Sequence, residues 1–112
     1  MKQITAVVRP SKVDPIKEAL VAIEVIGMTV RDVRGFGRQK GQVERYRGNE
    51  FTVEFIPKVS ITVVVNDDKL EPAIAAISTA AHTGEIGDGK IFVTSVDEVI
   101  RIRTGDRGAA AL

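Results

Sequence analysis

Apolar and polar residues alternate at the start of the chain and then recur at helical spacing. The alternation over residues 4–9 predicts a first strand, which Pro10 ends. Four apolar residues then follow the i, i+3, i+4, i+7 pattern of an amphipathic helix: Ile16, Ala19, Leu20 and Ile23. Asp14 is a candidate N-cap of this helix, Pro15 its first residue and Gly27 its stop.

The same order of strand, helix and strand occurs again in the second half. Residues 28–34 predict a second strand, and residues 51–66 a long third strand in which Pro57 favours a bend or an edge position. One face of that strand carries Val59, Ile61, Val63 and Val65. Asp67 or Asp68 can cap a second helix, and Thr83-Gly84 ends it. Its apolar stripe is Leu70, Ile74, Ile77 and Ala81. Residues 91–96 and 99–103 predict two last strands.

The predicted order β-α-β-β-α-β indicates an α+β fold of the ferredoxin-like type. Two helices would cover one face of an antiparallel sheet. The other face is partly apolar, with Val7 and Val64, and one copy of the fold has no third layer to cover it. We therefore expect a homo-oligomer built from a single domain over residues 1–112.

A long segment between the second and third strands has no hydrophobic period. Residues 35–50 read GFGRQKGQVERYRGNE, which predicts a loop, extending over about 37–55. Loops of this length are usually functional or disordered. Its mixed charge suits a protein partner, while RNA contact and a disordered insertion remain alternatives.

Composition narrows the functional classes. Sixteen basic and fifteen acidic residues leave a net charge of +1, which argues against a nucleic-acid partner. The chain has no Cys, and no apolar run approaches the ~18 residues of a membrane span, so we expect a cytoplasmic protein without disulfides or membrane insertion.

Two short motifs could hold an anion. Residues 84–90, GEIGDGK, combine glycines whose backbone can turn toward a phosphate with a terminal lysine, although a tight turn before a strand explains them equally. Arg101 and Arg103 would share one face of a strand and could grip one anion, or could simply protect a solvated edge. His82 stands alone, which fits a helix end better than a metal site. No Ser/His/Asp set or carboxylate pair supports an enzyme.

Taken in order, six segments resemble the PII nitrogen-regulatory protein family over almost the whole chain. They are ITAVVRP, GMTV, GFGRQKGQ, YRG, TGEIGDGKIFV and VIRIRTG. The loop sequence QVERYRG is most similar to the cyanobacterial and plant branch of the family. The resemblance implies a homotrimer that binds ATP or ADP between subunits, and Mg²⁺ and 2-oxoglutarate with the ATP.

The resemblance also implies a role for particular residues. The implied ATP contacts are Thr29, Gly37, Arg38, Val64, Gly87, Asp88, Gly89, Lys90, Arg101 and Arg103. In this arrangement residues 87–90 would wrap the phosphates, Arg101 and Arg103 would reach them from the neighbouring subunit, and Thr29 and Val64 would line the adenine pocket. The implied 2-oxoglutarate site is Gly37, Gln39, Lys40, Gly41, Lys58 and Gly87, with Gln39 also the Mg²⁺ ligand.

The long loop would contact the regulated proteins, through Arg45, Tyr46, Arg47, Asn49, Glu50 and Phe51. Members of the family use an ammonium channel, a metabolic enzyme or a transcriptional co-regulator as target. Asn49 and Phe51 lack the hydroxyl that some members modify, so we expect no covalent switch there. Ser60 and Thr62 replace residues that are often charged in the family. The preferred function is a non-enzymatic regulator of nitrogen and carbon metabolism; a small ATP-using enzyme and an RNA-binding module are the alternatives.

Overall fold

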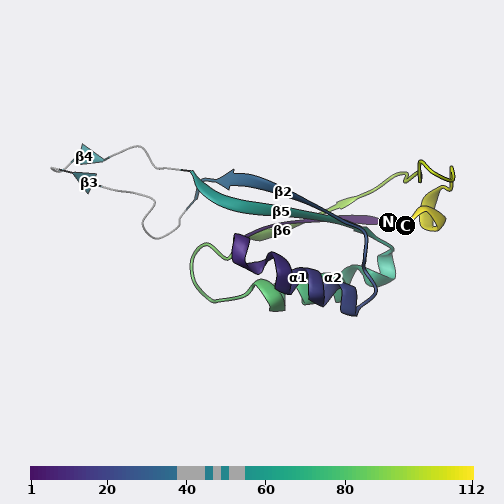
Figure 1. Ribbon diagram of the computed structural model, residues 1–112, viewed down its shortest axis with the longest axis horizontal. Helices are drawn as coiled ribbons and strands as arrows, with labels where there is room; N and C mark the ends of the chain where they lie inside the picture. Colours follow the sequence, from purple (N-terminus) through teal and green to yellow (C-terminus); the bar gives the residue numbers. More distant parts are fainter. Residues whose placement is uncertain (38–44, 47–48, 51–54) are drawn as a thin grey trace.

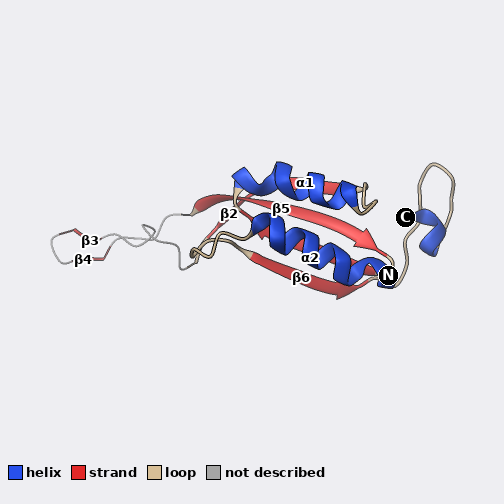
Figure 2. Ribbon diagram, turned by 90° about the horizontal axis from the view of Figure 1, so that it is seen from below, coloured by secondary structure: helices blue, strands red, loops and turns tan. Residues whose placement is uncertain are grey.

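The computed structural model describes residues 1–37 and 55–112, and also the backbone of residues 45–46 and 49–50. Its centre is a four-stranded antiparallel sheet in the order β2-β5-β1-β6. The strands are β1 (Lys2–Val8), β2 (Met28–Gly35), β5 (Ile56–Val65) and β6 (Lys90–Ser95). Two helices, α1 (Val13–Ala22) and α2 (Leu70–Ala81), lie side by side on one face (Figures 1 and 2). The predicted ferredoxin-like fold is confirmed.

The core lies between the helices and the sheet because each element points its apolar side inward. Alternate residues of β1 are buried, and so are Val59, Ile61, Val63 and Val65 of β5, which confirms the predicted strand faces. The stripes of both helices meet them. Lys58 and Ser60, on the other face of β5, are buried as well. The buried core comprises Ile4, Ala6, Val8, Ile16, Leu20, Val25, Val59, Ile61, Val63, Val65, Ala73, Ile77 and Ala81.

The predicted helix caps are wrong. Three-residue 3-10 turns, η1 (Pro10–Lys12) and η2 (Asp67–Lys69), precede α1 and α2, and no cap residue makes a side-chain bond to the helix. These turns begin right after extended residues, so Asp14 falls inside the helix and Asp68 inside the turn. The carboxylate of Asp67 instead pairs with the amino terminus of Met1 at 3.0 Å. These acidic residues still lie near the positive end of the helix dipole.

Pro57 lies at an edge position, one of the two predicted alternatives. It is paired with Arg34 of β2, whereas the pairing of β5 with β1 ends at Val59. At Pro57 the strand therefore has one neighbour, and the missing N–H of proline disturbs no second ladder.

Two other predictions about strands need correction. The long loop contains two short antiparallel strands, β3 (Arg45–Tyr46) and β4 (Asn49–Glu50), where no strand was predicted. In contrast, residues 99–103 form no strand; one isolated bridge joins Ile100 to Arg107, and a turn separates them. The last 3-10 turn, η3 (Gly108–Ala111), lies beyond the sheet at the end opposite the loop (Figure 1).

The sheet face away from the helices is open in the single chain. Phe92 on this face is 52% exposed, and Ile102 in the C-terminal segment is 98% exposed. Among the described residues, no helix is both long and apolar enough to span a membrane.

Candidate functional site

The glycine-rich segment that follows α2 forms a tight loop against the end of β1. Gly84, Gly87 and Gly89 all adopt positive φ angles, 87°, 107° and 102°. A side chain at Gly89 would place its Cβ 1.8 Å from the carbonyl oxygen of Val7. Residue 89 must therefore be glycine, because the loop crosses directly over the backbone of β1.

The carboxylate of Asp88 binds the loop itself. It accepts hydrogen bonds from the backbone N–H groups of Thr83, at 2.8 Å, and Gly84, at 2.9 Å, and from the hydroxyl of Thr83. Arg9 lies on its other side, with Nε 3.5 Å from Oδ1. The Thr83 hydroxyl first, and then these amides and Arg9, hold the pKa of Asp88 well below its usual range. The side chain is thus a fixed anion inside the loop.

Two cations fasten the loop to the sheet by its carbonyl groups. Arg9, just after β1, donates from Nη2 to the carbonyl oxygen of Ile86 at 2.9 Å. Lys58 in β5 donates from Nζ to the carbonyl oxygen of Gly87 at 2.8 Å. Burial lowers the pKa of Lys58, and the nearby charge of Arg9 lowers it further, while Asp88 opposes both.

A cavity of about 570 Å³ opens beside this loop. Of the predicted ligand residues, the structure brings Gly37, Lys58, Gly87, Gly89 and Lys90 together around it. Its other lining residues are Val7, Gly35, Phe36, Ile86 and Phe92. Two ammonium groups within an apolar wall suit an anion that carries a flat or apolar part.

A second cavity, of about 460 Å³, lies at the other end of the sheet. It contains the predicted adenine residues Thr29 and Val64, together with Ala109, Ala111 and Leu112 of the C-terminal segment. Six positions of β5 separate Lys58 from Val64, about 20 Å at the rise of a strand. One chain therefore does not unite the predicted adenine and phosphate residues.

The two predicted phosphate arginines belong to a self-contained turn. Arg101 donates from Nη1 to the carboxylate of Asp106 at 3.3 Å and from Nη2 to the carbonyl oxygen of Leu112 at 3.2 Å. Arg103 is exposed within the same turn. Neither arginine lines the 570 Å³ cavity, and without a strand the predicted sharing of one strand face does not hold.

Several predicted residues lie outside the described residues, namely Arg38, Gln39, Lys40, Gly41, Arg47 and Phe51. Of Arg45, Tyr46, Asn49 and Glu50 the structure gives the strand assignment only. Their predicted roles stay predictions.

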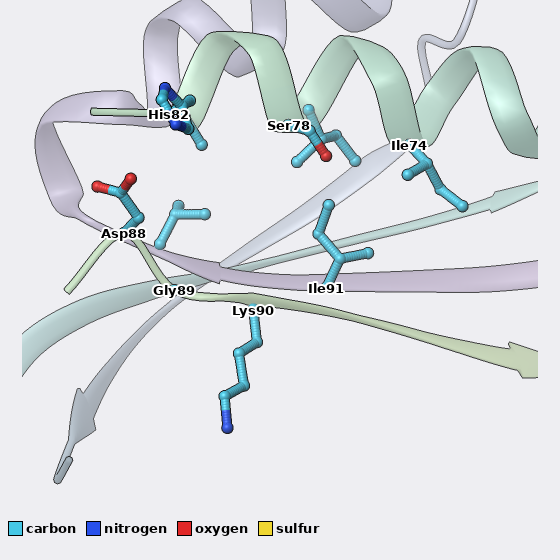
Figure 3. A pocket seen from close by; sticks show the side chains of 10 residues that line it. Ile74, Ser78, His82, Asp88, Gly89, Lys90 and Ile91 are labelled. Carbon is cyan, nitrogen blue, oxygen red and sulfur yellow. The ribbon is translucent and has the colours of Figure 1, made fainter. Parts of the chain in front are cut away.

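A smaller groove, of about 370 Å³, lies on the opposite side of β6, under α2. Figure 3 shows Ile74, Ser78 and His82 above it and Ile91 below. His82 is the C-cap of α2, as its position at a helix end predicts. Asp88 and Lys90 also line this groove, although the end of the Lys90 side chain extends to the side of the strand away from α2 (Figure 3).

Sequence reasoning missed Arg9, Thr83, Ile86 and Phe92 as parts of this region. Phe92 and Ile86 stand within the TGEIGDGKIFV segment, so the motif contained them without indicating where they point. Arg9 is a cation at the end of a strand, and only the pairing of β1 with β6 brings it beside the loop. No local signal could have identified it.

Comparisons with known proteins converge on one family. The family model described as Nitrogen regulatory protein P-II matches residues 1–106. The chain is 57% identical to the nitrogen regulatory protein P-II of Azospirillum brasilense and 54% identical to that of Nostoc punctiforme, in each case over all of both chains. It is also similar to the crystal structure of Arabidopsis thaliana PII bound to citrate, with a TM-score of 0.83, 42% identity, and coverage of 99% of this chain and 91% of that one.

Proposed function

The chain belongs to the nitrogen regulatory P-II family, and from that premise we propose that it binds ATP or ADP, and Mg²⁺ with 2-oxoglutarate, between the subunits of a homotrimer. Family membership makes it a signal-transduction regulator rather than an enzyme, as the sequence predicts. The ligands, the assembly and the target proteins form the proposed part.

The cavity beside the glycine loop carries the proposal. Lys58 and Lys90 both face it, and the backbone of Gly87 and Gly89 forms its rim. ATP is strongly anionic, and two ammonium groups with a glycine-rich backbone provide compensating charge and close approach. The apolar Val7, Ile86 and Phe92 would exclude water from the bound phosphates.

The separation of the predicted ligand residues supports a site between chains. The residues predicted to bind the phosphates and those predicted to bind the adenine lie at opposite ends of one sheet. A neighbouring copy that brought its Thr29, Val64, Arg101 and Arg103 to the first copy's loop would complete the set. The open sheet face and the fully exposed Ile102 also favour contact with further copies. We expect a mass of about three times 12.1 kDa in light scattering.

Lys58 is the proposed partner of a 2-oxoglutarate carboxylate. Its side chain is nearly buried, with the residue 9% exposed, and its ammonium group already bonds a carbonyl oxygen in the cavity wall. A carboxylate there would replace a neutral acceptor with a charged one, which makes a stronger bond. The Arabidopsis relative is described as bound to citrate, which is also a polycarboxylate.

The described residues that line the 570 Å³ cavity suit a polyanion that carries its metal better than they suit a free cation. Lys58 and Lys90 would repel free Mg²⁺, so the metal would enter with the nucleotide, and Gln39 would be its ligand from the chain. Bound Mg²⁺ would neutralise phosphate charge and link the nucleotide to the carboxylate. The residues of this chain would hold and orient both ligands.

The same cavity meets the root of the partner-binding loop. Gly35, Phe36 and Gly37 line it, and Phe36 contacts Phe55 across the base of the loop, with ring centroids 5.8 Å apart. A ligand that moves this wall would change the loop through which a target is bound, whether an ammonium channel, a metabolic enzyme or a transcriptional co-regulator.

Calorimetry of the purified assembly tests the proposal. Lys90→Ala should weaken ATP strongly, because removing one partner of a hydrogen-bonded charge pair costs on the order of 2–5 kcal/mol when the pair is buried, and less where it stays exposed. Lys17→Ala, on the exposed side of α1, is the matched control and should bind like the parent. 2-Oxoglutarate should bind only with Mg²⁺ and ATP present, and Lys58→Met should remove that binding. A parent protein that binds no ATP would refute the proposed function.

A further inference from the structure

Asp88 lies in the middle of the proposed phosphate loop, but its side chain is directed away from the cavity. Figure 3 shows Asp88 and Lys90 projecting to opposite sides of the chain as it enters β6. Lys90 lines the 570 Å³ cavity, and Asp88 does not. The two charged residues of the motif therefore have different tasks.

On charge alone, a carboxylate at this place is unfavourable. A fixed anion within a loop that receives phosphates repels them, and the repulsion acts over several ångströms. A neutral residue would bind phosphate better unless the carboxylate did something that the loop needs. The hydrogen bonds show what that is.

Thr83 and Asp88 close the loop on itself. Oδ2 of Asp88 receives the N–H groups of Thr83 and Gly84, and Oδ1 receives the Thr83 hydroxyl. The Thr83 hydroxyl oxygen in turn accepts the N–H of Glu85 at 3.1 Å. Three consecutive N–H groups are thus satisfied by two side chains, which fixes the first half of the loop.

Arg9 connects this closed loop to the sheet. Its guanidinium group bonds the carbonyl oxygen of Ile86 and lies beside Oδ1 of Asp88. Lys58 holds the next carbonyl, that of Gly87. Because each peptide unit is planar, holding its carbonyl group also sets the direction of the N–H of the following residue. The carboxylate of Asp88 therefore helps to set the backbone geometry that a phosphate would meet.

We propose that Asp88, together with Thr83, is a positioning residue of the phosphate loop: it holds residues 83–89 in their binding shape and touches no phosphate itself. The inference rests on the proposed function of this loop. The electrostatics agree with it, since the hydrogen bonds from Thr83 and Gly84 lower the pKa of Asp88.

The sign of one substitution separates positioning from simple proximity. Asp88→Asn keeps the size of the side chain and removes its negative charge. If Asp88 merely stands near the phosphates, the variant binds ATP more tightly than the parent. If Asp88 positions the loop, the loss of charge-assisted hydrogen bonds weakens ATP by about tenfold, the effect of about 1.4 kcal/mol. Asp14→Asn, which removes an exposed carboxylate from α1, should bind like the parent.

Substitutions of Thr83 give an independent test that does not change the charge. Thr83→Val has nearly the same shape but no hydroxyl, and should weaken ATP about as much as Asp88→Asn. Thr83→Ser keeps the hydroxyl and should restore binding to within about twofold of the parent. This pair decides the matter if Asp88→Asn does not fold.

Amide hydrogen exchange reports on the loop without any nucleotide. In Asp88→Asn, NMR should show exchange of the Thr83 and Gly84 amides at least about tenfold faster, because the charged acceptor is lost. The amide of His82, which bonds Ser78 within α2, should not change.

The outcomes separate this inference from the proposed function. A parent that binds no ATP overturns the function. If the parent binds and Lys90→Ala is impaired, but Asp88→Asn and Thr83→Val bind as well as the parent or better, the function stands and the positioning role is wrong. Weakened binding by both, with rescue by Thr83→Ser and faster exchange at Thr83 and Gly84, supports the inference.

Discussion

The glycine loop of residues 83–89 and the C-terminal segment of residues 97–112 both contain glycines at positive φ and both carry predicted phosphate residues. The glycine loop is tied to the sheet through Arg9, after β1, and Lys58 in β5. The C-terminal segment, among the described residues, makes its hydrogen bonds only within itself. The loop is therefore shaped by its own chain, whereas in the proposed assembly the arginines would gain a defined place relative to a ligand only from another copy.

Each region has an aspartate paired with an arginine, and the pair in the glycine loop is the less exposed of the two. Asp88 accepts three hydrogen bonds from loop donors and lies beside Arg9, both side chains about a quarter exposed. Asp106 pairs with Arg101, and both of these side chains are more than a third exposed. In the proposed arrangement the first carboxylate maintains a backbone shape, whereas the second, which also accepts the Thr104 hydroxyl at 2.8 Å, pairs with an arginine that a phosphate would need.

Matched glycine substitutions should reveal the largest difference between the regions. In Gly89→Ala the new Cβ meets the carbonyl of Val7, in addition to the positive φ, and nothing near it can yield. We expect a loss of about 3 kcal/mol or more, or failure to fold. Gly105→Ala has a φ of 74° but open space around it, so it should cost only about 1–2 kcal/mol. Denaturant unfolding at one fixed chain concentration measures both, and equal losses would contradict the close crossing of β1.

Removing one arginine from each region, Arg9 or Arg107, should lower the free energy of unfolding by less than the glycine substitution in the same region does. Arg9→Met leaves Asp88 and the Ile86 carbonyl without their cation, and should cost about 1–3 kcal/mol of unfolding free energy. Arg107→Met removes an exposed pair with Glu98 and should stay within about 0.5 kcal/mol of the parent. The comparison fails if Arg107 proves the more costly residue in the same unfolding assay.

Acid should weaken the loop through Asp88. Because its folded-state pKa lies below the unfolded value, its stabilisation is complete above about pH 4 and is lost as the pH falls through the folded-state pKa. The stability of Asp88→Asn should therefore fall less steeply with pH below about 4 than that of the parent. Asp67, whose pKa is lowered by its bond to the amino terminus, contributes in the same direction, and Asp67→Asn serves as the comparison. Parallel acid curves of Asp88→Asn and the parent would contradict the role of Asp88.

The smallest expected effect is a change in ATP affinity on substitution of Asp106. We expect tighter binding, whereas Asp88→Asn should weaken it. Asp106→Asn removes the carboxylate that holds Arg101 and should tighten ATP by about threefold, the scale of an exposed ion pair. The measurement is calorimetry beside Asp88→Asn. If Asp106→Asn weakens ATP, Asp106 presents Arg101 to the ligand instead of competing for it.

The sequence predicted the fold because burial leaves a local period. Ile4, Ala6 and Val8 alternate in β1, and Ile16 and Leu20 recur in α1, so the faces could be assigned without tertiary information. The residues that cap the two helices could not be assigned in this way, because a 3-10 turn and an α-helix share the same N-terminal residue preferences. The alternation Arg101-Ile102-Arg103 also resembled a strand, but a strand needs a neighbour, and the described residues offer this segment only one bridge.

The candidate site was predicted in part for a related reason. Motif residues that lie together in sequence, such as Gly87, Gly89 and Lys90, were found as a group and do line one cavity. Arg9 reaches Asp88 only through the register of β1 with β6, which no local pattern encodes. The direction of the Asp88 side chain depends on the turn itself, so its proximity to Lys90 in sequence could not indicate that the two side chains project to opposite sides of the chain.

The central claim is that the ligand residues of one site come from two chains. Lys90→Ala and Arg103→Ala should each weaken ATP, and mixed assemblies test whether they complement each other. After joint unfolding and refolding of equal amounts, about a quarter of the intersubunit sites should contain an intact loop from one chain and an intact arginine from the other. Calorimetry of the mixture should then recover high-affinity sites near that fraction. In a mixture of Lys90→Ala with the double variant Lys90→Ala/Arg103→Ala, no chain has an intact loop. Calorimetry should therefore find no high-affinity sites in it. If the first mixture binds no better than its two components, the site is not shared between chains and the account is wrong.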